Sequence, residues 1–218
     1  MKTIAIIPIK ARSRRVRSKN FRSFCGKPLY QFFLNKLTDH PFDEIIVDTD
    51  SKEIAEFSVY NGFSIIERNP ELASDSANGN DLLLHHAKLI DSDIYFQLFI
   101  TSPYLRKKTI NQAYDILIKN QDYDSLFTAT KIYSWFWFDS KPVNYDPKIL
   151  PRSQDATPII KETTGLYAIR KEALLENRCR IGKRPFMLFV DEIEGMDIDT
   201  ELDFSLAEYC FNEGLHKK

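Results

Sequence analysis

A cluster of basic side chains lies directly after the first apolar segment of the chain. Six of the ten residues from Lys10 to Lys19 are basic, although the formal net charge of the whole chain is −1. Its members are Lys10, Arg12, Arg14, Arg15, Arg17 and Lys19. Such a cluster repels itself unless it meets an anion, and Arg and Lys are the side chains that hold phosphate oxygens. A loop that wraps a polyphosphate is one interpretation. A solvated loop, or a patch for nucleic acid or anionic lipid, is the alternative.

A pair of aspartates, Asp197 and Asp199, lies near the other end of the chain. Alternate side chains of an extended segment point the same way, so both carboxylates can share one metal ion. Mg²⁺ prefers oxygen ligands and keeps several of its waters. The alternative is that one aspartate caps the following helix and that the other is a surface charge. A polyphosphate in the basic loop favours the metal interpretation.

Two further groups of polar residues flank strand-like segments. Thr101 and Ser102 follow an apolar run and could hydrogen-bond a sugar or base, although strand-to-helix turn chemistry explains them too. The second group leads into a later strand, where Gly165 permits close approach of a ligand. Its charged and amide members are Arg152, Gln154 and Lys161. They would bind an anionic, polyhydroxylated acceptor. The alternative is that they form a salt-bridged loop.

Composition limits the classes of protein that this chain can belong to. A length of 218 residues with 43% hydrophobic content is enough for one domain with a real core, and we expect a single domain over residues 1–218. The balance of 30 basic against 31 acidic side chains argues against a general nucleic-acid binder. No stretch is long enough to cross a membrane. Three widely spaced cysteines show neither zinc nor disulfide spacing, which predicts a reducing, cytoplasmic location.

The apolar pattern alternates between strand-like and helix-like segments. We expect strands at 3–8, 44–48, 63–66, 94–100, 125–130 and 164–169. We expect helices at 28–37, 51–60, 80–90, 107–119 and 200–211. This order predicts an α/β fold with a doubly wound, mostly parallel sheet of the Rossmann-like type. Ligands of such sheets bind at the carboxyl ends of the strands, which is where the basic cluster and Thr101 lie.

The stretch 132–160 interrupts that pattern. It holds six aromatic residues and four prolines without clear periodicity. We expect a protruding arm that packs on a partner subunit, because an exposed apolar patch of this size usually marks an interface. The alternative is a long loop folded over its own domain.

Taken in order, these motifs resemble the acylneuraminate cytidylyltransferases, the CMP-sialic acid synthetase group of the nucleotidyltransferase fold, over residues 3–211. The counterpart of the family's first motif in this chain is Pro8 to Arg14, followed by Lys19-Asn20 and Gly26-Lys27-Pro28. The later ones correspond to Arg68 to Asp75, to Phe99 to Pro103 with Arg106, and to Asp197-Ile198-Asp199-Thr200 ending at Asp203.

The resemblance implies that a hydroxyl of an acidic sugar attacks the α-phosphate of CTP and that pyrophosphate leaves. It implies that Lys10, Arg14 and Lys19 neutralise the phosphates and that Asp197 and Asp199 hold Mg²⁺. The nucleotide contacts that it implies are Ala11, Asn20, Arg68, Gly79, Gln97, Thr101 and Ser102. The acceptor contacts are Arg106, Arg152, Gln154, Lys161, Thr164 and Tyr167. It further implies a homodimer in which the arm of each subunit reaches the acceptor site of the other.

The chain departs from the family pattern at several positions. Ala11-Arg12 replaces a glycine pair, Phe99 stands where the family has a base-reading Gln, and Gly79 stands where it has a hydroxyl. Asn78, Asn80 or Gln97 could contact the base in place of these two residues. Three other interpretations stay open: a metal-dependent glycosyltransferase of related fold, a nucleic-acid or anionic-surface binding module, and an inactive homologue.

Overall fold

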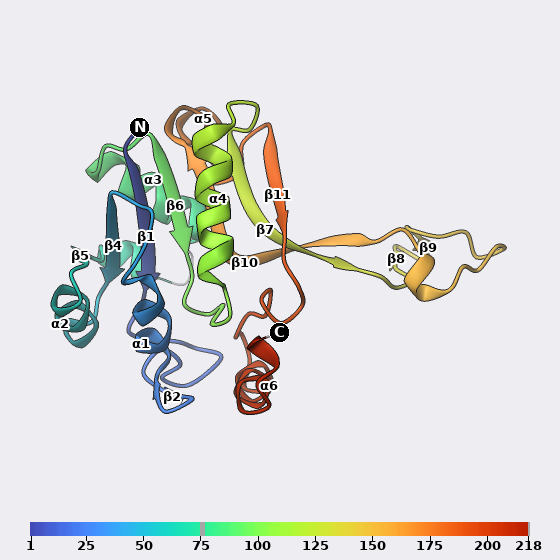
Figure 1. Ribbon diagram of the computed structural model, residues 1–218, viewed down its shortest axis with the longest axis horizontal. Helices are drawn as coiled ribbons and strands as arrows, with labels where there is room; N and C mark the ends of the chain where they lie inside the picture. The colour runs from blue at the N-terminus through green and yellow to red at the C-terminus, as the bar shows by residue number, and fades with distance from the viewer. Residues whose placement is uncertain (75–76, 218) are drawn as a thin grey trace.

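The computed structural model describes residues 1–74 and 77–217 and is organised around one seven-stranded sheet (Figure 1). The strand order is β11-β7-β10-β6-β1-β4-β5. The strands are β1 (Thr3–Ile9), β4 (Glu44–Thr49), β5 (Ser64–Glu67), β6 (Ile94–Leu98), β7 (Ser125–Ile132), β10 (Ile159–Arg170) and β11 (Pro185–Phe189). All neighbours pair in parallel except β10, which is antiparallel to both β6 and β7. The expected α/β fold with a mostly parallel sheet is confirmed.

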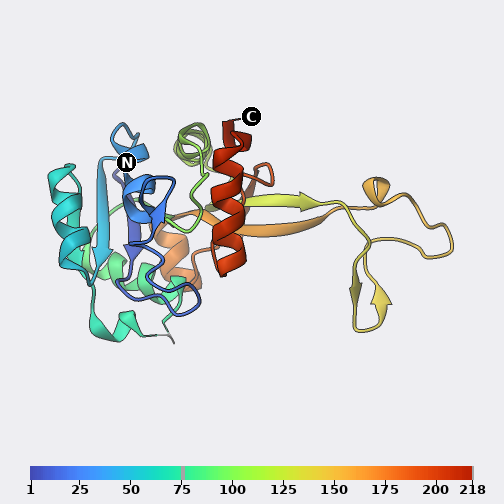
Figure 2. The same cartoon turned by 90° about the horizontal axis from the view of Figure 1, so that it is seen from below.

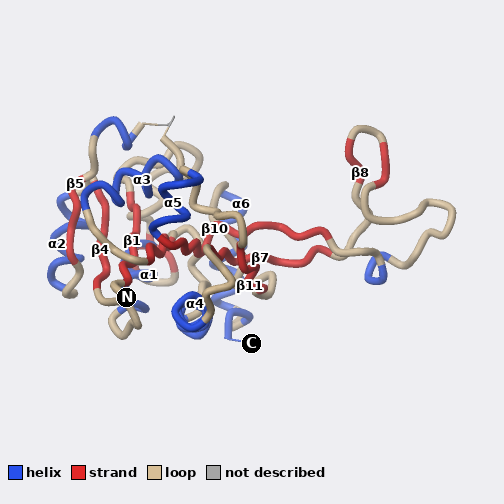
Figure 3. Tube along the Cα trace, turned by 90° about the horizontal axis from the view of Figure 1, so that it is seen from above, coloured by secondary structure: helices blue, strands red, loops and turns tan. Residues whose placement is uncertain are grey.

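Strand β1 shows how the sequence builds two cores. Its side chains alternate between the faces of the sheet, and both sets are buried because helices cover both faces. Ala5, Ile7 and Ile9 join the core beneath α1 (Leu29–Leu34), α2 (Lys52–Tyr60) and α4 (Lys107–Lys119). Ile4 and Ile6 face α3 (Gly79–Leu89) and α5 (Lys171–Asn177). Figure 3 shows α3 and α5 on one side of the sheet and α4 on the other.

A third core lies beyond the carboxyl ends of the strands. Helix α6 (Glu201–Asn212) packs Phe204 and Ala207 against Val16, Phe24 and Leu29 of the amino-terminal segment. Figure 1 shows α6 below the sheet, on the side to which β1 points. This packing brings the two ends of the chain together, because it fixes the segment before α6 next to the loop after β1.

Two helix starts follow the capping signals of the sequence. The Ser51 hydroxyl accepts a hydrogen bond from the Ile54 amide at the start of α2, and Thr200 with Asp203 forms a capping box at the start of α6. The region between α5 and α6 also contains β11, and neither α5 nor β11 is among the expected elements. Short pieces complete the chain: β2 (Ser23–Phe24), β3 (Lys27–Pro28), β8 (Trp137–Phe138), β9 (Lys141–Pro142), and the 3-10 turns η1 (Asn35–Leu37), η2 (Pro70–Ala73), η3 (Ser153–Asp155) and η4 (Leu215–Lys217).

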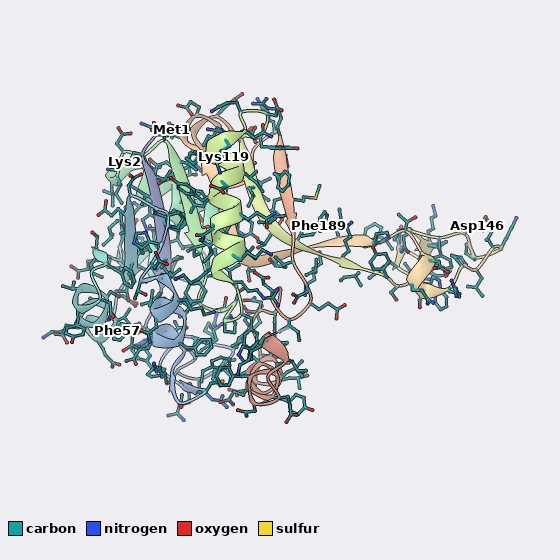
Figure 4. The ribbon with its side chains drawn as sticks, in the orientation of Figure 1. Met1, Lys2, Phe57, Lys119, Asp146 and Phe189 are labelled. Atoms are coloured by element: carbon teal, nitrogen blue, oxygen red, sulfur yellow. The ribbon has the colours of Figure 1, made fainter. Side chains whose placement is uncertain are left out.

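Residues 132–160 form a protruding arm rather than a loop folded over the domain (Figure 2). Strands β7 and β10 leave the sheet together, with Ile159 opposite Ile132, and both are longer than the sequence pattern predicts. Beyond them the Asn144 side chain joins three segments: its Nδ2 donates to the carbonyls of Ser134 and Thr157, and its Oδ1 accepts from the Phe136 amide. Asp146 lies toward the outer end of the arm and Phe189 near its root (Figure 4). The arm therefore has its own internal structure.

Among the helices of the described residues, none is long and apolar enough to cross a membrane.

Candidate active site

The basic loop lines a cavity at the carboxyl ends of β1 and β6. The cavity has a volume of about 530 Å³, and its other wall contains Phe99, Ile100 and Thr101. A second cavity, of about 630 Å³, lies between the same loop and Asp50, Pro70, Ala73 and Ser74. Lys10, Arg12 and Arg14 line both cavities. The loop therefore presents cations to two adjoining spaces, which together would accept a nucleoside and its phosphates.

Hydrogen bonds within the amino-terminal segment fix the path of the loop. Ser13 Oγ donates to the Val16 carbonyl and accepts from the Lys19 amide at 2.9 Å. Asn20 Nδ2 donates to the Lys10 carbonyl at 2.7 Å. The Ala11 amide donates to Asp50 Oδ1 at 2.5 Å. The Ser13 and Asn20 side chains thus hold the backbone of this loop, which lacks the family's glycine pair.

The structure brings the basic loop and the late aspartates together. Lys19 Nζ donates to the Ile198 carbonyl at 2.6 Å, and the Ile198 amide donates to the Thr101 carbonyl at 2.8 Å. The Arg15 guanidinium forms a two-point ion pair with the Asp199 carboxylate. Three segments that are distant in sequence thus meet at one edge of the sheet.

Lys19 occupies the centre of this meeting point. Burial lowers the pKa of Lys19, and the neighbouring Asp197 and Asp199 carboxylates oppose that shift. An ammonium in this environment gains from any further anion that approaches it. A phosphate in the cavity would therefore favour the charged form of Lys19.

The residues present fit a magnesium ion at the aspartate pair. Asp197 Oδ1 is buried and has no hydrogen-bond partner among the described residues, and a bare carboxylate oxygen of this kind is costly unless a cation reaches it. No group of three or more His, Cys, Asp or Glu side chains that could hold a metal occurs in the described part of the chain. Mg²⁺ often takes one or two carboxylates and completes its shell with water and substrate phosphates, so two aspartates beside a phosphate cavity are sufficient.

A β-bulge aims the acceptor-side residues of β10 at the strand end of β6. The pairing of β10 with β7 shifts register between Glu162 and Tyr167, and bulges often re-aim side chains next to active sites. Thr164 Oγ1 lies 3.4 Å from Ser102 Oγ. A Cβ on Gly165 would lie 3.3 Å from Ser102 Cβ, so glycine allows the two segments to approach. Ser102, Thr164 and Gly165 therefore lie close together.

An arginine that sequence reasoning missed lies beside Gly79, Gln97 and Phe99. Arg180 Cζ is 3.5 Å from the centre of the Tyr167 ring and 5.7 Å from that of Phe99. Arg180 Nη1 is 3.5 Å from Gln97 Oε1, and Gln97 Nε2 donates to the Gly79 carbonyl at 3.1 Å. No local motif marks Arg180, because its neighbours come from three other elements.

Two of the expected ligand contacts are engaged elsewhere. Buried Arg68 binds Asp48 Oδ1 and Oδ2 at 3.1 and 3.0 Å, and His86 Nε2 reaches the same carboxylate at 2.9 Å. Arg106 Nη1 binds Glu194 at 2.8 Å and Asp191 at 2.5 Å. Neither guanidinium lines the two cavities, and roles of Arg68 and Arg106 toward substrate stay predictions. Asp75 of the Arg68 motif lies outside the described residues.

The remaining acceptor contacts divide between the sheet and the arm. Tyr167 is buried in the sheet, and burial raises its pKa. Lys161 is exposed on the part of β10 that leads into the arm. Arg152 and Gln154 lie on the arm itself, where Arg152 Nε donates to Asp155 at 2.6 Å. The arm carries these two away from the cavities of their own chain (Figure 1).

The sequence of the chain is similar to those of several cytidylyltransferases and CMP-sugar synthases. The chain is 30% identical over 95% of its length to CMP-N,N'-diacetyllegionaminic acid synthase of Legionella pneumophila, and it covers 95% of that protein. It is 28% identical over 97% of its length to pseudaminic acid cytidylyltransferase of Campylobacter jejuni, and it covers 97% of that protein. It is 27% identical to N-acylneuraminate cytidylyltransferase A of Danio rerio and spans 49% of that longer chain.

Solved structures show the same fold. The structure of a CMP:2-keto-3-deoxy-manno-octonic acid synthetase complexed with CTP superposes with a TM-score of 0.71 at 18% identity, over 98% of this chain and 100% of that one. A 4-diphosphocytidyl-2C-methyl-D-erythritol synthase from Anaerococcus prevotii gives a TM-score of 0.69 at 15% identity, over 97% and 96% of the two chains. A family model described as cytidylyltransferase matches residues 4–209, nearly the whole chain, and the protein therefore belongs to the cytidylyltransferase family.

Proposed function

We propose that this chain is a single nucleotidyltransferase domain over residues 1–218, which transfers CMP from CTP to an acidic sugar with release of pyrophosphate. The observation that carries the proposal is the convergence of the basic loop with the aspartate pair, through Lys19 and Arg15. A triphosphate needs cations on its oxygens, and Mg²⁺ needs carboxylates beside them. Both requirements are met at one edge of the sheet.

The roles of the loop residues follow from their positions in the two cavities. Lys10, Arg14 and Lys19 would bind the triphosphate and stabilise the charge that grows on the departing pyrophosphate. The Ala11 backbone and Asn20, whose buried Oδ1 lacks a hydrogen-bond partner among the described residues, would orient the nucleotide. Thr101 and Ser102 would position the ribose or the attacking hydroxyl. Transfer then depends on placing the reactants rather than on a covalent intermediate.

Asp197 and Asp199 would hold Mg²⁺. When bound, the ion would neutralise phosphate charge and make the α-phosphorus more electrophilic. The chain's own contribution is to hold the segment that carries them next to Lys19, which lines the cavity. Asp203 anchors that segment, because its Oδ2 accepts from the amides of Asp199 and Thr200 at 3.1 and 2.7 Å.

We infer the substrate class from the relatives. Those named above act on N-acylneuraminic, pseudaminic and diacetyllegionaminic acids, which are all acidic sugars. Thr164 of β10 places a hydroxyl 3.4 Å from Ser102 Oγ, and Tyr167 and Lys161 of the same strand would supply a further hydroxyl and an ammonium group to such an acceptor. Gln97 and Gly79, which we expect to contact the nucleotide, are joined by the hydrogen bond from Gln97 Nε2 to the Gly79 carbonyl.

We propose a homodimer in which the arm of each subunit completes the acceptor site of the other. The arm exposes large apolar side chains, among them Trp137, Phe138, Ile149 and Leu150, and an exposed patch of this kind is typical of an interface. Arg152 and Gln154 would then serve the partner's site. The three cysteines are free thiols, which supports a reducing, cytoplasmic location. CTP, an acidic sugar and a second copy of the chain are the proposed partners, without nucleic acid or membrane.

The decisive experiment follows pyrophosphate release from each of the four nucleoside triphosphates with Mg²⁺. The acceptors are N-acetylneuraminic, pseudaminic and N,N'-diacetyllegionaminic acids and 2-keto-3-deoxy-manno-octonic acid. We expect release only with CTP and only when an acidic sugar is present. Release of a nucleoside diphosphate from a nucleotide sugar would favour the glycosyltransferase alternative. Silence across the whole panel would contradict the proposal.

A further inference from the structure

We propose that Arg180 is a specificity-determining residue that binds the carboxylate of the acidic acceptor. The inference rests on the proposed function. That function assigns roles to the basic loop, the aspartate pair and the hydroxyl groups of β10, but none to Arg180. Arg180 lies between α5 and β11, next to the segment of β10 that faces Ser102.

The guanidinium lies over an aromatic ring. Arg180 Cζ lies 3.5 Å from the centre of the Tyr167 ring, with Phe99 at 5.7 Å. The Arg180 backbone is fixed as well, because its amide donates to Asn80 Oδ1 at 2.9 Å. Stacking on an aromatic ring leaves the edge of a guanidinium available for planar anions. The side chain is thus positioned before any ligand arrives.

The guanidinium N–H donors of Arg180 make only long contacts within the described part of the chain. Among the described residues, its hydrogen-bond and ion-pair partners are Gln97 Oε1 at 3.5 Å and Glu162 Oε1 at 3.8 Å. Charge-assisted hydrogen bonds are usually 2.7–2.9 Å long, and a guanidinium carries five N–H donors. Glu162 also accepts a hydrogen bond from the Tyr167 hydroxyl. A side chain that is 20% exposed and has only these long contacts is suited to receive an anion.

Gly79 leaves the space that Arg180 occupies. A Cβ on Gly79 would lie 2.3 Å from Arg180 Nη1 and 3.2 Å from its Cζ. Gly79 is the first residue of α3, directly after the N-cap Asn78, and its backbone does not require glycine there. The position at which the resembling family has a hydroxyl is therefore small here because an arginine fills the space. Phe99, which replaces the family's Gln, lies 5.7 Å from the same guanidinium.

The acceptor carboxylate fits this position better than the nucleotide does. The triphosphate is expected to meet the cations of the 10–19 cluster that line the two cavities, whereas the acceptor's own anion has no assigned cation in this chain's sheet apart from exposed Lys161. Arg180 stacks on Tyr167 and approaches Glu162 of β10, the strand that also carries Thr164. A carboxylate is planar and can accept two parallel N–H donors from arginine.

The test compares Arg180→Ala and Arg180→Lys with the wild type, using whichever of the four acidic sugars gives the highest wild-type turnover. We expect Arg180→Ala to raise the KM for that sugar at least tenfold and to change the CTP Kd less than twofold. Arg180→Lys should recover part of the affinity. The methyl ester of the sugar, which lacks the charge, should be a poor substrate of the wild type and should lose that disadvantage with Arg180→Ala. Arg184→Ala, which removes an exposed arginine from the same segment, is the matched control.

A second variant keeps the proposal testable if Arg180→Ala folds poorly. Gly79→Ser should push the guanidinium away and raise the KM for the sugar, and Gly79→Ser/Arg180→Ala should be no worse than Arg180→Ala. An unchanged sugar KM in active Arg180→Ala would overturn the assignment, and so would a defect confined to CTP. A wild type with no turnover on any of the four sugars would refute the proposed function and this inference with it. An active wild type with an unaffected variant would refute this inference alone.

Discussion

The Arg15 guanidinium donates two hydrogen bonds to the Asp199 carboxylate, from Nη1 at 2.9 Å and from Nη2 at 2.6 Å. This pair joins the basic loop directly to the segment proposed to bind metal. Both side chains are partly exposed, at 67% for Arg15 and 41% for Asp199, and exposed ion pairs contribute only ~0.2–1 kcal/mol. The contact is therefore weak enough to be exchanged when Mg²⁺ and a nucleotide arrive.

The first prediction is that Arg15 competes with a metal ion for Asp199. In the absence of nucleotide, Arg15→Ala should raise the affinity for Mn²⁺ about two- to fivefold, the factor that corresponds to an exposed ion pair. Electron paramagnetic resonance of free Mn²⁺ measures this affinity. Arg17→Ala removes a charge from the same loop and controls for the general electrostatic effect. Equal gains in the two variants would mean that the specific pairing plays no part.

The second prediction concerns the two aspartates. Asp199→Asn and Asp197→Asn each keep the size of the side chain and remove the charge that Mg²⁺ requires, so turnover should fall at least a hundredfold while part of the CTP binding survives. Steady-state pyrophosphate release and calorimetry separate the two effects. Glu201→Gln, on the neighbouring helix turn and paired with Arg22, should leave turnover close to that of the wild type. Normal turnover in the aspartate variants would refute the metal assignment.

The third prediction separates Arg14 from Arg17, a cation of the same loop that lines neither cavity. Arg14 lines both cavities, so Arg14→Ala should weaken CTP binding about ten- to hundredfold, as expected for lost charge-assisted hydrogen bonds worth ~1.5–3 kcal/mol. Arg17→Ala should change it less than threefold. Titrations at two salt concentrations distinguish contact from screening. Equal effects of the two substitutions would show that only the net charge of the loop matters.

The fold could be predicted from this sequence because its local signals agree with one another. Strand β1 is apolar on both faces, and Ser51 and Asn61 bound α2 as capping residues do. Strand β11 was missed although Phe186 to Phe189 form an apolar run, because a run this short does not distinguish a strand from a buried helix segment. The direction of β10 depends on the arm that returns the chain to the sheet, which periodicity does not report.

The candidate site was predictable in its residue types more than in its pairings. The basic cluster and the aspartate pair were identified, but six neighbouring cations look alike in sequence. Which one faces Asp199 is decided by the turn that Ser13 and Asn20 hold. Arg180 gave no signal because its partners, Tyr167, Gln97 and Gly79, come from separate elements.

The fourth prediction follows from Lys36, whose ammonium is buried under the turn after Ser102. Lys36 Nζ donates to the carbonyls of Pro103 and Leu105, and burial lowers the pKa of Lys36 to about 7 while Glu194 opposes the shift. The unfolded chain, with the ordinary pKa of 10.5, binds more protons between pH 7 and 10.5. Stability should therefore increase with pH through that window.

Urea unfolding at pH 6, 7, 8 and 9 measures this effect. Below pH 7 both states hold the proton, so the contribution of Lys36 should level off. Above it, the free energy of unfolding should rise by up to about 1.4 kcal/mol per pH unit. Lys36→Met should have a flatter profile over the same range, and Lys107→Met, which alters an exposed lysine nearby, should keep the wild-type slope. Parallel profiles for wild type and Lys36→Met would exclude the buried ammonium as the source.

The last prediction addresses the arm. Trp137 and Phe138 expose 58% and 77% of their surface in the single chain, which is costly in water unless another surface covers them. Trp137→Ser/Phe138→Ser should shift the mass measured by light scattering from dimer toward monomer. Because the nucleotide cavities lie within one chain, CTP affinity should stay within about twofold of the wild type.

Turnover of the same variant should fall, because in the proposed dimer Arg152 and Gln154 serve the acceptor site of the partner. Raising the protein concentration should restore it, since mass action favours the dimer. Tyr60→Ser, which removes an aromatic ring that is 89% exposed on α2, is the control and should leave the mass unchanged. A wild type that is monomeric at all concentrations, yet fully active, would mean that the arm acts within its own chain and that the acceptor contacts must be sought among Lys161, Thr164, Tyr167 and Arg180 alone.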